Sequence, residues 1–577
     1  MMSFNKTFFI TALCSFGLYS GFAQEKDKES ELGTEVVEII KPYSPSISDA
    51  FKIKAIPQSL DSVSGEKKTV TYEINSVPVA STFTPEKGRA ATVERPKREK
   101  IFANYAKLGI GNYMNVLGEA ALNFDISREE NASLFFRHNS SQGNIKDVVL
   151  DDFYYDTRLD AKYASNQREY SYDVSLGLEQ QSYNWYGVPS PDFYSNETLG
   201  KIDPLHSFFA ATVGGNFALK NTYFEGGKAR LRYLGDSYSS SEIQFTLNPE
   251  FLFSIDNVAL RLEADIDYLT GSFENDFLAQ QQISYGFLKA GIIPSFSFSK
   301  DNLSLSIGAA AYLGMDSENS TSDFSIHPRI RANYRLDEAI SLYAGADGGI
   351  NQNSYYDIKE ANPFVSPTLY LAPTKNVYKG YAGITGIIQG RYGYNFRVSH
   401  GKEDNRALFK ANMPHSVPTN PQGYHYNNSF QVTYDDVTKL SVFGEFQMNF
   451  SERLRAGVNA TYFNYATETD NPAWNLPDFT ASVFSDFKIT DDLTGGLTLF
   501  YVGERKDEFA ESTTVTKEVT LDGYADANLR FTYQINNRFS AFVNGNNLLN
   551  SQYSKWLNYP VQGIQIMVGA IYKFDWN

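Results

Sequence analysis

From residue 101 to the end of the chain, polar and apolar side chains alternate with a period of two. In the segment 258–268, one face carries Val258, Leu260, Leu262, Ala264, Ile266 and Tyr268, and the other carries Arg261, Glu263, Asp265 and Asp267. Successive residues of a strand point to opposite sides of a sheet. Charges at every second position cannot be buried in a protein core without partners, but they suit a water-filled lumen whose outer wall meets lipid. The alternation therefore predicts a transmembrane β-barrel.

The connections between these segments differ in length. Short polar turns fall at 254–257, 299–302, 336–339, 451–453, 490–492 and 536–538. Long connections fall at 187–202, 273–281, 315–323, 353–376, 402–428, 467–478, 505–518 and 551–563. This difference is typical of outer-membrane barrels, which have short periplasmic turns and long extracellular loops. The count of alternating segments predicts an all-β, antiparallel barrel of about 22 strands over residues 101–577.

The N-terminal hundred residues differ from the rest. Lys6, the apolar run 7–19 and Gly21-Phe22-Ala23 predict a signal peptide over residues 1–23. Cys14, the only cysteine, lies inside it, so the mature chain is predicted to lack thiols and disulfides. Residues 24–100 carry mixed charges and prolines with few regular patterns, which predicts a mostly extended periplasmic or lumenal arm.

Composition narrows the function further. The chain has 67 acidic and 51 basic residues, a formal net charge of −16, which argues against a nucleic-acid partner. The six histidines lack the spacing of metal ligands, and no metal or other cofactor is predicted. His138 and Ser140 could share one side of a strand, as in hydrolases built on a barrel wall, but no third catalytic member is evident. We therefore predict that the protein is not an enzyme.

The C-terminal third resembles TonB-dependent receptors of the bacterial outer membrane. The likeness rests on YVGER at 501–505, DGYADANLR at 522–530, NNLLNSQY at 546–553, and Tyr559-Pro560 leading to Gly563 and the closing strand GAIYKF at 569–574. It covers residues 455–574 in detail and the strand pattern back to residue 101 more loosely. The resemblance implies an outer-membrane location, with membrane lipid around the barrel.

The family resemblance leaves two functions open. Receptors of this family carry a plug domain of well over a hundred residues, whereas about 75 residues precede this barrel. A TonB-box-like stretch is present at Thr34, Glu35, Val36, Val37, Glu38 and Ile39, which favours TonB as a partner. The first hypothesis is a transporter-like or pore-forming barrel with the N-terminal arm in or below the lumen. The alternative is a non-transporting scaffold or binding subunit of a multiprotein outer-membrane complex, with surface lipoproteins or other subunits as partners.

Two long loops combine aromatic residues with prolines. The candidate contact residues are Tyr355, Tyr356, Phe364 and Tyr370 in the 353–376 loop, and Phe409, Tyr424 and Tyr426 in the 402–428 loop. They could form a preshaped surface for a partner or ligand. Alternatively, the loops fold inward and pack together to close the pore. The lumenal charges also have two interpretations: they line a permeation path, or they form ion pairs that hold the wall in shape.

Overall fold

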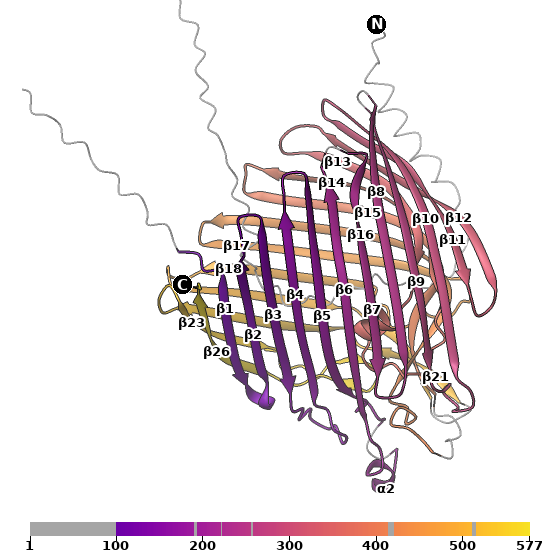
Figure 1. The fold of residues 1–577 in the computed structure, drawn as a ribbon. Helices are drawn as coiled ribbons and strands as arrows, with labels where there is room; N and C mark the ends of the chain where they lie inside the picture. Colours follow the sequence, from indigo (N-terminus) through magenta and orange to yellow (C-terminus); the bar gives the residue numbers. More distant parts are fainter. Residues whose placement is uncertain are drawn as a thin grey trace, which may run out of the picture. The chain divides into compact units, whose positions relative to one another are not determined.

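The computed structural model describes residues 100–189, 193–220, 222–255, 258–413, 420–510 and 515–576. Twenty-two strands form one antiparallel sheet, and the first strand pairs with the last, so the sheet closes into a barrel (Figure 1). The predicted all-β barrel of about 22 strands is confirmed. Its strands are β1 (Asn104–Gly111), β2 (Val116–Asp125), β3 (Glu130–Ser141), β4 (Tyr154–Asn166), β5 (Tyr170–Asn184), β6 (Leu205–Leu219), β7 (Phe224–Asp236), β8 (Ser241–Ile255), β9 (Val258–Phe273), β10 (Ile283–Lys300), β11 (Leu303–Asp316), β12 (Thr321–Arg335), β13 (Ser341–Asn351), β14 (Thr374–Ile388), β15 (Tyr392–Ala411), β16 (Phe430–Ser451), β17 (Leu454–Thr467), β18 (Phe479–Lys488), β19 (Leu493–Val502), β22 (Tyr524–Gln534), β23 (Phe539–Asn546) and β26 (Gln565–Phe574).

The two faces of the wall meet different surroundings, as the alternation predicts. On β9, the Tyr268 side chain is exposed on the outside, whereas its neighbour Asp267 is buried on the inside. On the inner face, the Lys289 ammonium of β10 lies 2.9 Å from Asp265 and 3.7 Å from Asp267. Nearby, Arg261 lies 2.5 Å from Glu250. The interpretation that the lumenal charges form ion pairs is thus confirmed for these residues. The outer face is an apolar belt suited to lipid.

The connections again differ between the two ends of the barrel. Short turns such as 167–169 and 452–453 join strands at one end, and long loops emerge at the other. Two predicted loops are shorter than expected, because β15 extends to Ala411 and the connection between β11 and β12 covers only 317–320. The loops hold their own short elements: the 3-10 turn η2 (Asn112–Met114), α2 (Asn196–Leu199), α3 (Tyr355–Ala361), the hairpin of β20 (Arg505–Ala510) and β21 (Thr516–Leu521), and the hairpin of β24 (Ser554–Trp556) and β25 (Tyr559–Pro560). Within the described ranges, none of the helices has the length and apolar character needed to cross a bilayer.

The barrel closes at the seam between β1 and β26, from Asn104 opposite Phe574 to Gly111 opposite Met567. Beyond the seam, Trp576 stacks on Phe124 of β2 with ring centroids 5.1 Å apart, and its Nε1 donates to the Asn123 carbonyl at 2.8 Å. Aromatic rings at a strand end suit the membrane–water interface. These contacts hold the last strand across the seam onto β2.

Gly569 at this seam leaves no room for a side chain, because an added Cβ would meet the Leu108 carbonyl and the Phe542 ring. We expect Gly569→Val to destabilise the barrel by at least the roughly 1–3 kcal/mol typical of overpacking. The neighbouring Ala570 is exposed on the lipid face, so Ala570→Val is the matched control and should be neutral. Heat-modifiable migration of the refolded protein in gels checks both variants. Equal folding yields for the two would contradict this description of the seam.

Candidate functional site: the loop cap and the α3 latch

The long loops at one end of the barrel fold inward and pack against one another. We call the described parts of 185–204, 352–373, 412–429, 503–523 and 547–564 the cap. At its centre, the Tyr559 ring stacks on Phe364 at 3.8 Å between centroids and lies 5.9 Å from Phe430. These three rings come from the hairpin before β26, the loop after β13 and the start of β16. Loops from separate parts of the wall therefore meet over the mouth of the barrel.

Hydrogen bonds to the backbone satisfy several buried polar side chains of the cap. The Asn428 side-chain amide donates to the Trp185 carbonyl at 2.7 Å, and Trp185 Nε1 donates to the Phe364 carbonyl at 3.1 Å. The Tyr559 hydroxyl donates to the Asn428 carbonyl. Buried indole and phenol groups require such partners. Because they have them, Trp185 and Tyr559 can be almost fully buried.

The Asp507 carboxylate joins β20 to the connection after β17 and to the end of β15. It accepts hydrogen bonds from the Asn475 side-chain amide at 2.7 Å and from the backbone amides of Ala411 at 3.0 Å and Glu508 at 2.8 Å. The side chain is fully buried. Burial raises the pKa of Asp507 to about 6. We therefore expect the packing around Asp507 to depend on the protonation state of this carboxyl group.

The short helix α3 in the loop after β13 begins at a well-formed N-cap. The Ser354 hydroxyl accepts a hydrogen bond from the Asp357 amide at 3.1 Å, and Asp357 places a negative charge in the first turn. Glu242 on β8 accepts from the free amides of Tyr355 at 2.5 Å and Tyr356 at 3.1 Å. The first turn of α3 is thus held directly by the inner face of the wall.

One face of α3 is buried, and it carries a lysine. Lys359 follows the buried residues Tyr355 and Ile358 at helical spacing, and its side chain is 0% exposed. Its ammonium donates to Glu179 Oε1 at 2.7 Å, Gln181 Oε1 at 2.6 Å and Glu360 Oε1 at 2.7 Å. Glu179 and Gln181 belong to β5. An internal ion pair therefore joins the loop to the wall.

Arg232 on β7 makes the second set of contacts with α3. Its guanidinium donates to Ser354 Oγ at 3.0 Å, lies 3.5 Å from the Asp357 carboxylate, and covers the Tyr356 ring at 3.9 Å from the centroid. The Tyr355 hydroxyl donates to Asp236 Oδ2 at 2.9 Å. We call the contacts of α3 with Glu179, Gln181, Arg232, Asp236 and Glu242 the α3 latch. The latch is polar and charged, whereas the centre of the cap is aromatic.

The structure places the predicted loop residues as follows: Tyr355, Tyr424 and Tyr426 are buried, Tyr356, Phe364 and Phe409 are half-buried, and Tyr370 is 58% exposed. The interpretation in which the loops pack on one another is therefore observed. A role in contacting a partner or ligand remains a prediction. The TonB-box-like residues 34–39 lie outside the described residues.

His138 and Ser140 share one side of β3, as predicted. His138 Nε2 lies 3.2 Å from Ser140 Oγ, and its Nδ1 lies 2.8 Å from Thr157 Oγ1. The group that orients the histidine is thus a hydroxyl, which stabilises an imidazolium far less than a carboxylate does. Nor, in the part of the chain that the structure describes, are three or more His, Cys, Asp or Glu residues grouped to hold a metal ion.

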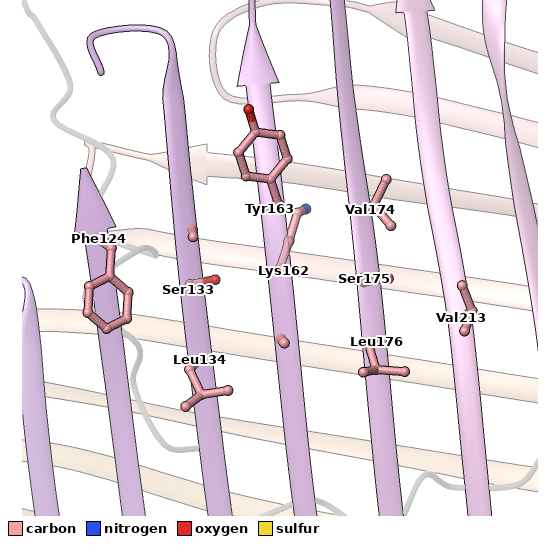
Figure 2. Close-up of a pocket in the computed structure, with 11 residues that line it drawn as sticks. Phe124, Ser133, Leu134, Lys162, Tyr163, Val174, Ser175, Leu176 and Val213 are labelled. Atoms are coloured by element: carbon pink, nitrogen blue, oxygen red, sulfur yellow. The ribbon is translucent and has the colours of Figure 1, made fainter. Parts of the chain in front are cut away.

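A shallow depression crosses the wall from β2 to β6 (Figure 2). Its larger apolar side chains are Phe124, Leu134, Tyr163, Val174, Leu176 and Val213. The register aligns Leu134, Leu176 and Val213 through neighbouring strands, so these three share the outer face. The depression is part of the lipid-facing belt and is not suited to a polar solute.

Solved structures with the same architecture identify the fold. The FrpB iron transporter from Neisseria meningitidis matches with a TM-score of 0.64 at 10% identity, over 83% of this chain and 82% of that one. The ferripyoverdine receptor of the outer membrane of Pseudomonas aeruginosa matches with a TM-score of 0.60 at 14% identity, over 83% and 73%. This is a TonB-dependent receptor-like barrel. The copper transporter OprC resembles the receptor-like barrel with a TM-score of 0.58 at 13% identity, over 83% and 81%.

No protein-family model and no curated protein matches the sequence. The fold and the apolar outer belt place the receptor-like barrel in the bacterial outer membrane. Sequence reasoning did not find Lys359 or its partner Glu179, which are 180 residues apart. The available signal was weak: Glu179 lies on the polar side of an alternating strand, and Lys359 follows Tyr355 and Ile358 at helical spacing.

We expect Tyr559→Ala to destabilise the cap by about 3–5 kcal/mol, because it removes a buried ring at the meeting point of three loops. Tyr370→Ala is the matched control, since Tyr370 is an exposed aromatic residue of the same cap. Limited proteolysis of the purified barrel should cleave the cap much faster in Tyr559→Ala only. Equal cleavage of the two variants would contradict the packing described above.

The cap is also expected to respond to pH through Asp507. A carboxyl group whose pKa is raised in the folded state loses its proton less readily in the closed cap than after the cap has opened. The closed cap is therefore more stable at low pH, where this group is protonated. Stability from this group should be fully present below the ordinary pKa of 3.8 and lost as the pH rises through about 6.

Trp474 precedes Asn475, which donates to Asp507, and its fluorescence reports on this response in a variant that keeps it as the only tryptophan. Acrylamide quenching of its fluorescence should increase from about pH 4 to about pH 7, and Asp507→Asn should flatten that change. If the pH dependence of quenching is unchanged in Asp507→Asn, a group other than Asp507 causes it.

Proposed function

We propose that this protein is a ligand-gated outer-membrane import receptor and that the cap is its extracellular gate. The observation that carries the proposal is the α3 latch, in which a loop is held inside the barrel by ion pairs and hydrogen bonds to the wall. Polar contacts of this kind can be exchanged for contacts with water or with a ligand. An apolar core of the same size would be much more costly to expose.

The lumen beneath the cap supports a path for polar solutes. Its wall carries ion pairs of charged side chains, such as Arg261 with Glu250 and Lys289 with Asp265. Structural neighbours are described as iron and copper transporters and as a receptor for ferripyoverdine. In this proposal, the arm 24–100 lies in or below the lumen, and residues 34–39 contact TonB. Energised import would then couple TonB to opening of the cap.

The second candidate is a scaffold or binding subunit of an outer-membrane complex. It is favoured by aromatic residues that the cap presents to solvent, Tyr370 at 58% and Phe193 at 41% exposure. Exposed aromatic rings are common at the centre of protein interfaces. Surface lipoproteins or other subunits would be the partners. Purification in mild detergent separates the candidates, because a scaffold brings stoichiometric partners with it.

Conductance in planar bilayers tests the gate directly. We expect the wild-type barrel to be closed and a variant with residues 354–371 replaced by a short Gly-Ser linker to conduct steadily, because the linker removes the α3 latch. Deleting residues 25–98 tests separately whether the arm occupies the lumen. If the linker variant and the double variant both remain closed while folded, the gate proposal is wrong. Growth on scarce nutrients with and without TonB then tests whether import is energised.

A further inference from the structure

Lys359 of α3 occupies an enclosed site made for an ammonium group. Three oxygen atoms, from Glu179, Gln181 and Glu360, accept its hydrogen bonds at 2.6–2.7 Å. This number of acceptors matches the three N–H donors of a primary ammonium. The ammonium also lies 5.6 Å from the Phe208 ring centroid and 4.5 Å from that of Tyr356, within the range of cation–π attraction. The site thus recognises both the charge and the three N–H donors of its occupant.

The wall half of the site stays behind when α3 moves away. Glu360 and Tyr356 belong to the helix itself, whereas Glu179, Gln181 and Phe208 belong to β5 and β6. Together they would present a carboxylate, an amide oxygen and an aromatic ring to the lumen. Once α3 has moved away, these three groups therefore form a cation-binding site without a bound cation.

Charge makes an empty site unfavourable. Asp156 on β4 lies opposite Gln181 in the register, so a second carboxylate is next to Glu179 on the inner face. Arg158 lies opposite Glu179 in the same register, and its guanidinium donates hydrogen bonds to Asp160 at 2.7 and 3.2 Å. Removing one partner of a buried ion pair is strongly destabilising. A cation that takes the place of the Lys359 ammonium therefore favours opening of the α3 latch.

We propose that this site is the ligand-recognition site of the barrel, that its ligand carries a primary ammonium on an alkyl chain, and that Lys359 is an internal substitute for it. A ligand ammonium entering the site displaces Lys359 and releases α3 from the wall. The release of α3 by a ligand rests on the proposed gate function. The binding of an ammonium group at this site does not, and it can be tested by a binding measurement alone.

The experiment uses the full-length barrel with Lys359→Ala and n-propylammonium, which replaces the atoms that the substitution removes. Binding is measured by calorimetry, and order in the cap by the fluorescence of its tryptophans, which include Trp185. We expect Lys359→Ala to loosen the cap and n-propylammonium to bind saturably and restore the spectrum. The uncharged analogue n-propanol should have no effect. Adding Glu179→Gln to Lys359→Ala should weaken n-propylammonium binding at least tenfold.

Lys359→Met is the second variant, because it keeps the apolar part of the side chain and so protects folding. It should fold and leave the site without an ammonium group. Failure of n-propylammonium to bind folded Lys359→Ala, or equal binding with and without Glu179→Gln, overturns the proposal and shows a purely structural ion pair. That result would not decide the proposed gate function, which the conductance of the linker variant tests separately. Conversely, if n-propylammonium binds to Lys359→Ala but the linker variant does not conduct, the ammonium site is supported and the proposed gate function is wrong.

Discussion

The width of the barrel is the constraint on which the rest of the structure depends. Twenty-two strands in one closed sheet leave a lumen that the side chains of the wall cannot fill. The outer face must be apolar to meet lipid, and the period of two then places polar residues inside. A polar lumen cannot be closed by simple collapse of its wall. Here it is covered by loops that bring their own aromatic core, with Tyr559 at the centre.

The two parts of the closure differ in physical character. The centre of the cap is aromatic, and exposing it would cost roughly 25 cal/mol for each Å² of apolar surface. The α3 latch is built from charged groups, whose net contribution to stability is small as long as each has a partner. The charged contacts of the α3 latch fix the position of the loop, and they can be exchanged for contacts with another charged group. A loop held in this way is suited to release by a ligand that supplies the same charge as Lys359.

Most of the wall could be predicted from the sequence, because its rules are local. The alternation in 258–268 predicted which residues face the lumen, and the short turns predicted the end at which strands are joined tightly. The closing strand and its aromatic residues were also recognisable. Their side chains obey a period of two whatever the distant parts of the chain do.

The cap and the latch could not be predicted in this way. The aromatic residues with prolines left two interpretations open, because the same composition suits a binding surface and an internal core. Trp185 and Phe364 are 179 residues apart, and no local pattern links them. The hairpin of β20 and β21 begins in the segment 505–518, which was expected to be a plain loop, and extends to Leu521. Contacts between loops depend on where the wall places them.

Cysteine labelling in intact cells tests most directly whether the mouth is closed by packed loops. Once Cys14 is replaced, Ser366→Cys and Tyr370→Cys can each be the only cysteine of the chain. Ser366 is fully buried in the cap, and Tyr370 is exposed only four residues further on. A membrane-impermeant maleimide should label position 370 rapidly and leave position 366 unlabelled until the outer membrane protein is denatured. Labelling of both positions at the same rate would show that the loops are open and would contradict the account.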